Sequence, residues 1–222
     1  MRSNPTCPRC GRAAHPPNLW SSAWQCVAHG SVAPLQQLRP CTSEALAALL
    51  STTQVPVWIP WPLPTGWLVT GLATAGDERS GGVASVVALS GPAPLGGVGE
   101  LAVVAEHMGV GLGARLAGLA GTDPGEDFDQ HPADDKVRFD GHEIALWTLD
   151  TGVNRAVYLG EALGQWIWFV FGTADTGMTM CEVVALRDLR DLHRTSEGGL
   201  ALEPPFGAPS PFLSEMLAPR TQ

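Results

Sequence analysis

Two short cysteine and histidine motifs near the N-terminus have the spacing of a metal site. One is Cys-Pro-Arg-Cys-Gly, which begins at Cys7, and the other is Cys-Val-Ala-His-Gly, which begins at Cys26. In each motif a tight turn, or knuckle, directs two ligands at one ion, and the glycine that follows supplies a positive φ. Three thiolates and one imidazole complete a tetrahedral shell and leave no position for substrate water. The motifs predict a structural zinc ion (Zn²⁺) with four ligands: Cys7, Cys10, Cys26 and His29.

The segment that carries these motifs is too short to fold alone. About 40 residues bury too little apolar surface for independent stability, so a bound metal supplies the missing free energy. Residues 7–34 resemble the zinc-ribbon superfamily, with His29 where that superfamily more often has cysteine. His15 and Cys41 are the nearby substitutes for the fourth ligand, but neither lies in a knuckle. We therefore expect His29 to complete the site.

A glycine-rich run and an acidic run carry weaker chemical signals. Residues 109–114, Gly-Val-Gly-Leu-Gly-Ala, are similar to a dinucleotide-binding fingerprint, but the surrounding βαβ pattern is missing, so we expect a turn before a short helix and no cofactor. The acidic loop, residues 123–135, lacks the ligand order of a calcium loop, and we expect a solvated surface loop. Its charged residues are Asp123, Glu126, Asp127, Asp129, His131, Asp134 and Asp135.

Catalytic residues are harder to identify. Cys181 is a candidate nucleophile if His107 or His142 lies beside it, although a small buried thiol on a helix face is the ordinary alternative. A further candidate metal group, with a solvated helix face as its alternative, consists of Asp188, Asp191 and His193. No Ser-His-Asp order, phosphate-binding loop or paired-carboxylate motif is present. The sequence therefore gives no direct indication of an enzyme.

Charge is unevenly distributed along the chain. The 222 residues have a formal net charge of −9 and are 45% hydrophobic, an ordinary share for a globular protein. Residues 1–43 contain four arginines and no acidic residue, so the remainder has a net charge of −13. The cationic ribbon permits binding of nucleic acid through Arg9, Arg12 and Arg39. However, tight phosphate binding takes about 6–10 cationic contacts, and the acidic remainder repels a polyanion.

The compartment is predicted from what the sequence lacks. No apolar run approaches the ~20 residues of a membrane helix, and residues 1–4 lead into no secretory apolar segment. Five cysteines, most of them in the ribbon, fit a reducing compartment better than a disulfide framework. These features predict a cytoplasmic protein without a membrane partner.

Periodicity predicts the fold class as α+β. Short turns between strands favour antiparallel hairpins, and residues 165–171 are apolar on both faces, as in a central strand. The predicted strands are 31–38, which closes the ribbon, then 67–74, 83–90, 100–106, 136–148, 156–159 and 165–171. The first predicted helix is short, runs through Ala45, Leu46, Leu49 and Leu50, and has Thr42-Ser43 as its N-cap. Two further helices are predicted over residues 110–119 and 175–192. The expected architecture is an N-terminal zinc ribbon followed by an antiparallel β-sheet packed against helices.

The chain divides into four parts. Residues 1–43 form the ribbon, 44–66 a linker helix with an extended proline- and tryptophan-rich segment, 67–194 the α+β body, and 195–222 a flexible tail. In the second part the prolines exclude a central strand, and we expect Trp58 and Trp61 to press onto the body, with a proline-rich partner ligand as the alternative. In the tail, the apolar face of residues 212–217 docks either on the body or on a partner.

Several longer motifs together resemble an uncharacterised actinobacterial family, a domain of unknown function, down to about Asp191. These motifs are Cys-Pro-Arg-Cys-Gly-Arg at 7–12, Leu-Trp-Ser-Ser-Ala-Trp-Gln-Cys at 19–26, Pro-Trp-Pro-Leu-Pro at 60–64, Ala-Leu-Ser-Gly-Pro-Ala-Pro-Leu-Gly-Gly at 88–97, Gly-Val-Gly-Leu-Gly-Ala-Arg at 109–115 and Gly-Glu-Ala-Leu-Gly at 160–164. The resemblance implies an actinobacterial, cytoplasmic protein. It implies no activity, cofactor or catalytic residue.

The leading hypothesis is a non-enzymatic zinc-ribbon protein whose α+β body binds a protein partner or a small ligand, in an adaptor or regulatory role. The first alternative is a hydrolase or transferase that uses the acidic loop or Cys181. The second is a nucleic-acid-binding regulator that acts through the ribbon.

Overall fold

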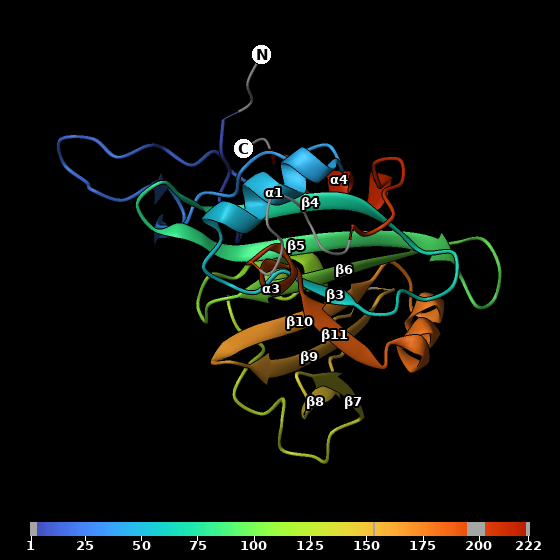
Figure 1. Ribbon diagram of the computed structural model, residues 1–222. Helices are drawn as coiled ribbons and strands as arrows, with labels where there is room; N and C mark the ends of the chain where they lie inside the picture. The colour runs from blue at the N-terminus through green and yellow to red at the C-terminus, as the bar shows by residue number, and fades with distance from the viewer. Residues whose placement is uncertain (1–3, 153, 195–202, 221–222) are drawn as a thin grey trace.

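The computed structural model describes residues 4–152, 154–194 and 203–220. Its main feature is a curled sheet of nine strands in the order β3-β11-β7-β8-β9-β10-β6-β5-β4 (Figure 1). Neighbouring strands pair antiparallel, except for β11 and β7, which are parallel. The strands are β3 Trp58–Pro60, β4 Leu68–Asp77, β5 Gly81–Pro92, β6 Val98–Glu106, β7 Asp135–Phe139, β8 His142–Thr148, β9 Ala156–Ala162, β10 Gln165–Phe171 and β11 Ala185–Asp188.

Both faces of the sheet are apolar, and each has its own core. Along β10 the alternation is clear: Ile167 and Phe169 join the core on one face, whereas Trp168 and Val170 join the core on the other. The first core is closed by α1 Ser43–Thr52, β3 and the 3₁₀-helix η1 Asp175–Glu182. The prediction that residues 165–171 form a central strand is confirmed, because six of the seven residues are buried.

The prediction of one strand over residues 136–148 is wrong. The segment folds as a hairpin of β7 and β8 in which Phe139 pairs with His142. Asp140 and Gly141 connect the strands, with φ values of 48° and 80°. Two consecutive positive φ values fit the two-residue hairpin turn that Asp-Gly favours. This hairpin adds a strand to the sheet.

The helices of the described residues are few and short, so the sheet packs against helices only weakly and the predicted helical layer is incomplete. The α-helices are α1 Ser43–Thr52, α2 Leu112–Ala117, α3 Leu189–Arg194 and α4 Pro211–Leu217. The protein is therefore mostly β, and the helices cover only parts of the sheet faces (Figure 1). The N-cap predicted at Thr42-Ser43 is formed by Thr42, whose hydroxyl accepts a hydrogen bond from Ala45 N at 3.2 Å, and Ser43 is the first residue of the helix.

The helix predicted over residues 175–192 is also wrong. The segment consists of η1, then β11, then α3, of which the first residue is Leu189. β11 pairs with β7 and β3, which are remote in the sequence. This pairing satisfies the backbone N–H and C=O groups of β11, which in a helix would bond to one another. Helical spacing of apolar residues was therefore outweighed by long-range strand pairing.

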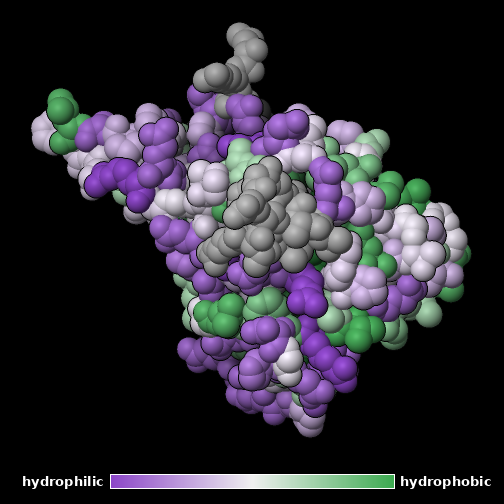
Figure 2. Space-filling view, viewed as in Figure 1, coloured by the Kyte–Doolittle hydropathy of each residue, from purple (hydrophilic) through white to green (hydrophobic). Residues whose placement is uncertain are grey.

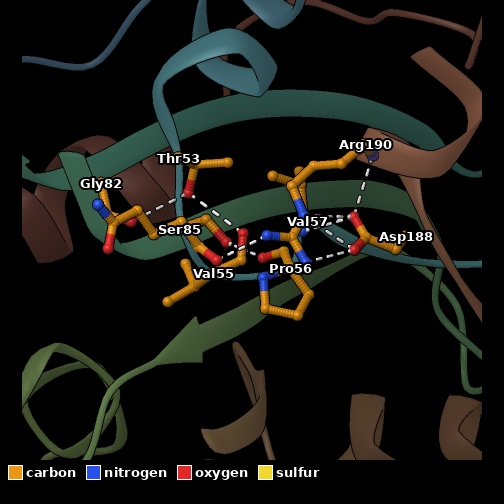
Figure 3. A network of polar contacts seen from close by, with 9 residues as sticks. Thr53, Val55, Pro56, Val57, Gly82, Ser85, Asp188 and Arg190 are labelled. Atoms are coloured by element: carbon orange, nitrogen blue, oxygen red, sulfur yellow. Dashed lines mark hydrogen bonds and ion pairs between the residues drawn. The ribbon is translucent and has the colours of Figure 1, made fainter. Parts of the chain in front are cut away.

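The proline- and tryptophan-rich segment is anchored by polar contacts (Figure 3). Asp188 accepts a hydrogen bond from Val57 N at 3.1 Å and pairs with Arg190 at 2.7 Å, and Ser85 Oγ donates to Pro56 O at 2.6 Å. Trp58 is buried in edge strand β3, as the packing interpretation predicted, and Trp61 is half-buried. The segment is thus part of the core and not an exposed proline-rich ligand.

The C-terminal segment also differs from the loose extension expected after residue 195. Residues 203–220 return to the sheet, and α4 buries Leu213 and Leu217 in the second core. Ser210 caps α4 by accepting a hydrogen bond from Leu213 N and donates one to Glu100 at 2.8 Å. Of the two docking possibilities for residues 212–217, the described residues adopt docking on the body.

None of the described helices is both long enough and apolar enough to span a membrane.

Candidate metal centre

The ribbon brings the four predicted ligands together. It contains one short hairpin, β1 Gln25–Cys26 with β2 Gly30–Ser31, beside the knuckle that begins at Cys7. The ligand atoms of the four residues all lie within 4.8 Å of one another. Cys10 Sγ lies 3.7 Å from Cys26 Sγ, and His29 Nδ1 lies 3.5 Å from Cys7 Sγ. Within the part of the chain that the structure describes, no other group of three or more such ligand atoms comes as close.

The backbone of both knuckles has the expected form. Gly11 and Gly30 have φ values of 75° and 66°, as predicted for the residue after each second ligand. Gly11 N donates to Cys7 O at 2.9 Å, and His29 N donates to Cys26 O at 3.3 Å. These turns place both ligands of a knuckle on the same side of the chain. The residues present thus fit a four-coordinate metal ion.

The two alternative fourth ligands lie elsewhere. His15 pairs with Gln25 through backbone hydrogen bonds, and Cys41 packs against the first core of the sheet. Neither belongs to the ligand cluster. All five cysteines are free, and 3.7 Å between sulfurs is far beyond the ~2.05 Å of a disulfide bond.

The thiols differ in their local electrostatics. Burial raises the pKa of the Cys7 thiol to about 12. Burial also raises the pKa of Cys26, but hydrogen bonds from the Ala28 and His29 amides and with the Cys10 and Cys7 side chains together outweigh this effect and leave that pKa below its usual value. A buried thiol such as Cys7 becomes a thiolate readily only beside a cation, which is the condition that a bound metal provides.

A buried arginine fixes the ribbon to the body. Arg115, in α2, is only 7% exposed, and its guanidinium donates to Cys7 O at 3.2 Å. It also donates to Met216 O, in the last turn of α4, at 3.0 Å and to Ala218 O, directly after α4, at 3.2 Å. A Cβ atom added at Gly11 would lie 2.7 Å from the Arg115 side chain, so the ribbon approaches this group very closely. Arg115 therefore connects the metal knuckle, α2 and the C-terminal segment.

Two further arginines hold the ribbon from either side. Arg9, inside the first knuckle, donates to Gly109 O at 2.7 Å and to Val110 O at 3.3 Å. Arg79, in the turn after β4, donates to Ser22 O at 3.0 Å. The ribbon is thus bound to the body at several points, and its orientation is set by the tertiary structure.

Comparison with known proteins supports one part of the resemblance inferred from the motifs, which is membership of an uncharacterised family. A model described as "Family of unknown function (DUF6758)" matches residues 1–213. The chain belongs to this family. The comparison with curated proteins found no match, and the comparison with solved structures found none either. The family thus covers both the ribbon and the curled sheet, and it carries no named activity.

Packing explains the glycine-rich run, residues 109–114, which leads into α2. A Cβ atom at Gly113 would lie 2.2 Å from Trp168 Nε1, so this position accepts no side chain. The amides of Leu112 and Gly113, which begin the helix, donate to the buried Glu106 carboxylate at 2.7 and 3.0 Å. A carboxylate already occupies the place where a dinucleotide fingerprint would hold a phosphate. The similarity to that fingerprint is therefore superficial.

Glu106 gives a prediction for pH dependence. Burial raises its pKa from 4.5 to about 7, despite the two amide hydrogen bonds. The folded state then binds a proton that the unfolded state releases, so the free energy of unfolding falls as pH rises from 4.5 to about 7. We expect the free energy of unfolding to fall by about 2–4 kcal/mol over this window. The full stabilisation is present below the lower pH.

Chemical denaturation of metal-loaded protein across this pH range would measure the effect. Glu106→Gln should flatten the profile relative to the wild type, whereas Glu143→Gln, at an exposed position, should leave it unchanged between these pH values. Equal slopes for wild type and Glu106→Gln would show that this carboxyl does not titrate in the window.

The acidic loop is more structured than predicted. Asp123 accepts hydrogen bonds from Gly109 N at 3.0 Å and Trp166 Nε1 at 2.9 Å, and Asp134 accepts from Thr148 N at 2.8 Å. The Phe128 ring packs edge-on against Trp147 and Trp166, with centroids 5.6 and 5.5 Å apart. These contacts explain why part of the loop is not simply solvated. Its other acidic residues at 126, 127 and 129 are exposed.

The candidate catalytic residues do not converge. Cys181 is exposed on η1 and not buried, which corrects the packing prediction. It lines a 210 Å³ pocket whose other residues include Lys136, Arg138 and Glu143 but neither His107 nor His142. Asp188 is engaged by Arg190, and the side chain of His193 lies outside the described residues.

Sequence reasoning missed Arg115 and Glu106. Each is a single charged residue beside apolar ones. Arg115 lies inside the run Leu-Gly-Ala-Arg-Leu-Ala, and Glu106 directly follows Ala-Val-Val-Ala. Charged residues are rarely buried without partners, so such isolated charges indicate specific buried contacts.

Proposed function

We propose that this protein is a non-enzymatic, cytoplasmic zinc-ribbon protein in which a structural Zn²⁺ orders the ribbon, and the ribbon with the adjoining body binds a protein partner. The observation that carries the proposal is a closed set of four ligands on a ribbon fixed to the body by Arg115. A metal held in this way stabilises a surface, because no coordination position is left for chemistry.

The ligand distances support zinc as the metal. Zn–S bonds of about 2.3 Å and Zn–N bonds of about 2.0–2.1 Å in a tetrahedron separate two sulfurs by about 3.8 Å, and sulfur from nitrogen by about 3.6 Å. The separation of Cys10 Sγ from Cys26 Sγ is 3.7 Å, and His29 Nδ1 lies 3.5 Å from Cys7 Sγ and 3.7 Å from Cys26 Sγ. Three thiolates with one imidazole are also a common donor set of structural zinc sites. Five free cysteines are consistent with a reducing, cytoplasmic environment.

The alternatives have weaker support. For a nucleic-acid regulator, Arg9 is already engaged by two body carbonyls, which leaves Arg12 and Arg39 as exposed cations of the ribbon among the described residues. For a hydrolase or transferase, Asp123 and Asp134 hold backbone amides, and no histidine lines the pocket beside Cys181. Among the pockets that the described residues form, the one we propose for a small ligand has 480 Å³ and lies between Trp24 of the ribbon and the turn after β4.

The proposal is tested by affinity capture from host lysate with three full-length proteins. We expect a specific protein to bind the wild type and Cys181→Ser, but not Cys10→Ser, because only Cys10 belongs to the metal cluster. Deleting the ribbon is a poorer comparison, since it would strip the contacts that Arg9 and Arg115 make. Retention of the same protein by Cys10→Ser would contradict docking through the ribbon. Capture of nothing by any form would direct attention to a small ligand in the 480 Å³ pocket.

A further inference from the structure

The C-terminal segment, residues 211–220, is held by two separate sets of contacts. The first set is apolar. α4 lies against β4 (Figure 1), and Leu213, which is only 1% exposed, packs over Gly71, where an added Cβ atom would lie 2.6 Å from the leucine side chain. Leu217 is buried in the same core. The second set is polar and joins the segment to the ribbon.

The polar contacts converge on the knuckle that begins at Cys7. Arg220 N donates a hydrogen bond to Gly11 O at 3.0 Å. Arg115 donates to two carbonyls of the segment and also to Cys7 O. A Cβ atom at Gly11 would lie 3.3 Å from Ala218 O, so the two backbones approach closely. The end of the segment therefore rests on the knuckle itself.

The shape of this knuckle depends on the proposed metal ion. The ribbon core around Cys7 and Cys26 is small and separate from both cores of the sheet, and Figure 2 shows the ribbon extending from one side of the body. A segment that buries so little apolar surface takes its folding free energy from the metal. Loss of the ion therefore disorders the carbonyl groups on which the end of the segment rests.

Charge also favours the closed position of the segment when the metal is bound. Zn²⁺ with three thiolates and a neutral imidazole is an anionic cluster. The charge of buried Arg115 interacts with those of Cys7, Cys10 and Arg220. The anionic cluster thus attracts the Arg115 guanidinium and offsets its repulsion from Arg220, the residue that reaches the knuckle.

We infer that residues 211–220 are a metal-gated strap, which is closed on the sheet while the ion holds the knuckle and opens when the ion leaves. The hinge lies at Ser210, because Gly207 N donates to Val69 O at 2.8 Å and Ser210 N to Thr70 O at 3.0 Å, and neither bond involves the ribbon. Once open, the seven-residue α4 is too short to stay helical alone. This inference rests on the structural zinc ion of the proposed function and adds a response to its loss.

The coupling acts in both directions. If bound zinc favours the closed strap, the closed strap favours bound zinc by the same factor, because the two equilibria form one thermodynamic cycle. We expect a factor of about ten, since the contacts of Arg115 with the strap are few and only part-buried. The strap is therefore also a determinant of zinc affinity, although it supplies no ligand.

Hydrogen exchange on the full chain tests the gate. The zinc-loaded protein is measured, then the same protein after treatment with a strong zinc chelator, and again after zinc is restored. We expect exchange over α4 to be about tenfold faster without zinc and to recover with it, whereas β10 keeps its protection throughout. Unchanged exchange over α4, beside a ribbon that has lost protection, would overturn the inference and leave the metal assignment intact. A chain that binds no zinc would overturn both.

Zinc affinity, obtained by competition with a chromophoric chelator, tests the reverse direction. Leu213→Ala weakens docking of α4 but leaves the knuckles and Arg115 in place, and we expect zinc to bind about tenfold more weakly. Leu186→Ala is the matched control, because Leu186 is 2% exposed in the other core. Leu213→Met keeps the bulk of the side chain and should bind zinc like the wild type. Protection of β10 verifies that each variant is folded. Equal zinc affinities for Leu213→Ala and Leu186→Ala would show that strap and metal are independent.

Discussion

Cys10→Ser should abolish stoichiometric zinc binding and unfold the ribbon while the curled sheet stays folded. Binding of structural zinc contributes about 10–16 kcal/mol at neutral pH, and the small ribbon core around Cys7 and Cys26 is too small to replace it. Native mass spectrometry would show one zinc ion per wild-type chain and none per variant. Cys181→Ser is the control, since Cys181 lies outside the cluster.

Hydrogen exchange would show how far the loss extends. We expect protection to disappear over the ribbon, residues 5–32, and to weaken over α4, because Arg115 links Cys7 O to the carbonyls of Met216 and Ala218. β10, at the centre of the sheet, should keep its protection. A folded, metal-free wild type with full protection in the ribbon would contradict the metal assignment.

Arg115→Met should destabilise the folded protein strongly. Methionine retains an apolar side chain of similar length but removes the donors to three carbonyls, of which Cys7 O belongs to the metal knuckle. Of the three contacts, only the one to Cys7 O is buried, and the other two are part-buried. A buried acceptor left without a donor costs about 1–3 kcal/mol and a partly exposed one less, so we expect a loss of about 2–4 kcal/mol in the free energy of unfolding. Denaturant titration of the zinc-loaded proteins would measure it.

The matched control is Arg79→Met, which removes a single hydrogen bond at an exposed position. We expect less than about 1 kcal/mol from that change. Arg115→Lys should fall between the two, since an ammonium cannot reproduce the planar fork of a guanidinium. Similar losses for Arg115→Met and Arg79→Met would mean that Arg115 does not hold the ribbon.

Local sequence patterns predicted those features that depend on neighbouring residues. The knuckle spacing identified the four ligands that the fold brings within 4.8 Å of one another, and Thr42 was recognised as a helix cap. The apolar character of residues 165–171 located the central strand β10. Asp140-Gly141, between β7 and β8, is also a local turn signal in the sequence. The prediction of one strand over residues 136–148 did not take it into account.

Pairing between remote segments determined the rest. Residues 175–192 have helical spacing, yet β11 forms there because β3, more than a hundred residues earlier, and β7 offer backbone partners. In the same way, the tertiary fold leaves Cys181 exposed and buries Glu106, and this burial raises the pKa of the Glu106 carboxyl.

The sequence by itself predicted the four clustered ligands, an antiparallel sheet and a resemblance to an uncharacterised family, because ligand spacing and alternation act over a few residues. Only the tertiary structure decided that Arg115 locks the ribbon to the body and that Leu19 and Trp20 project from it into solvent. The physical reason is that burial and hydrogen-bond satisfaction depend on segments far apart in the chain, which no local pattern encodes.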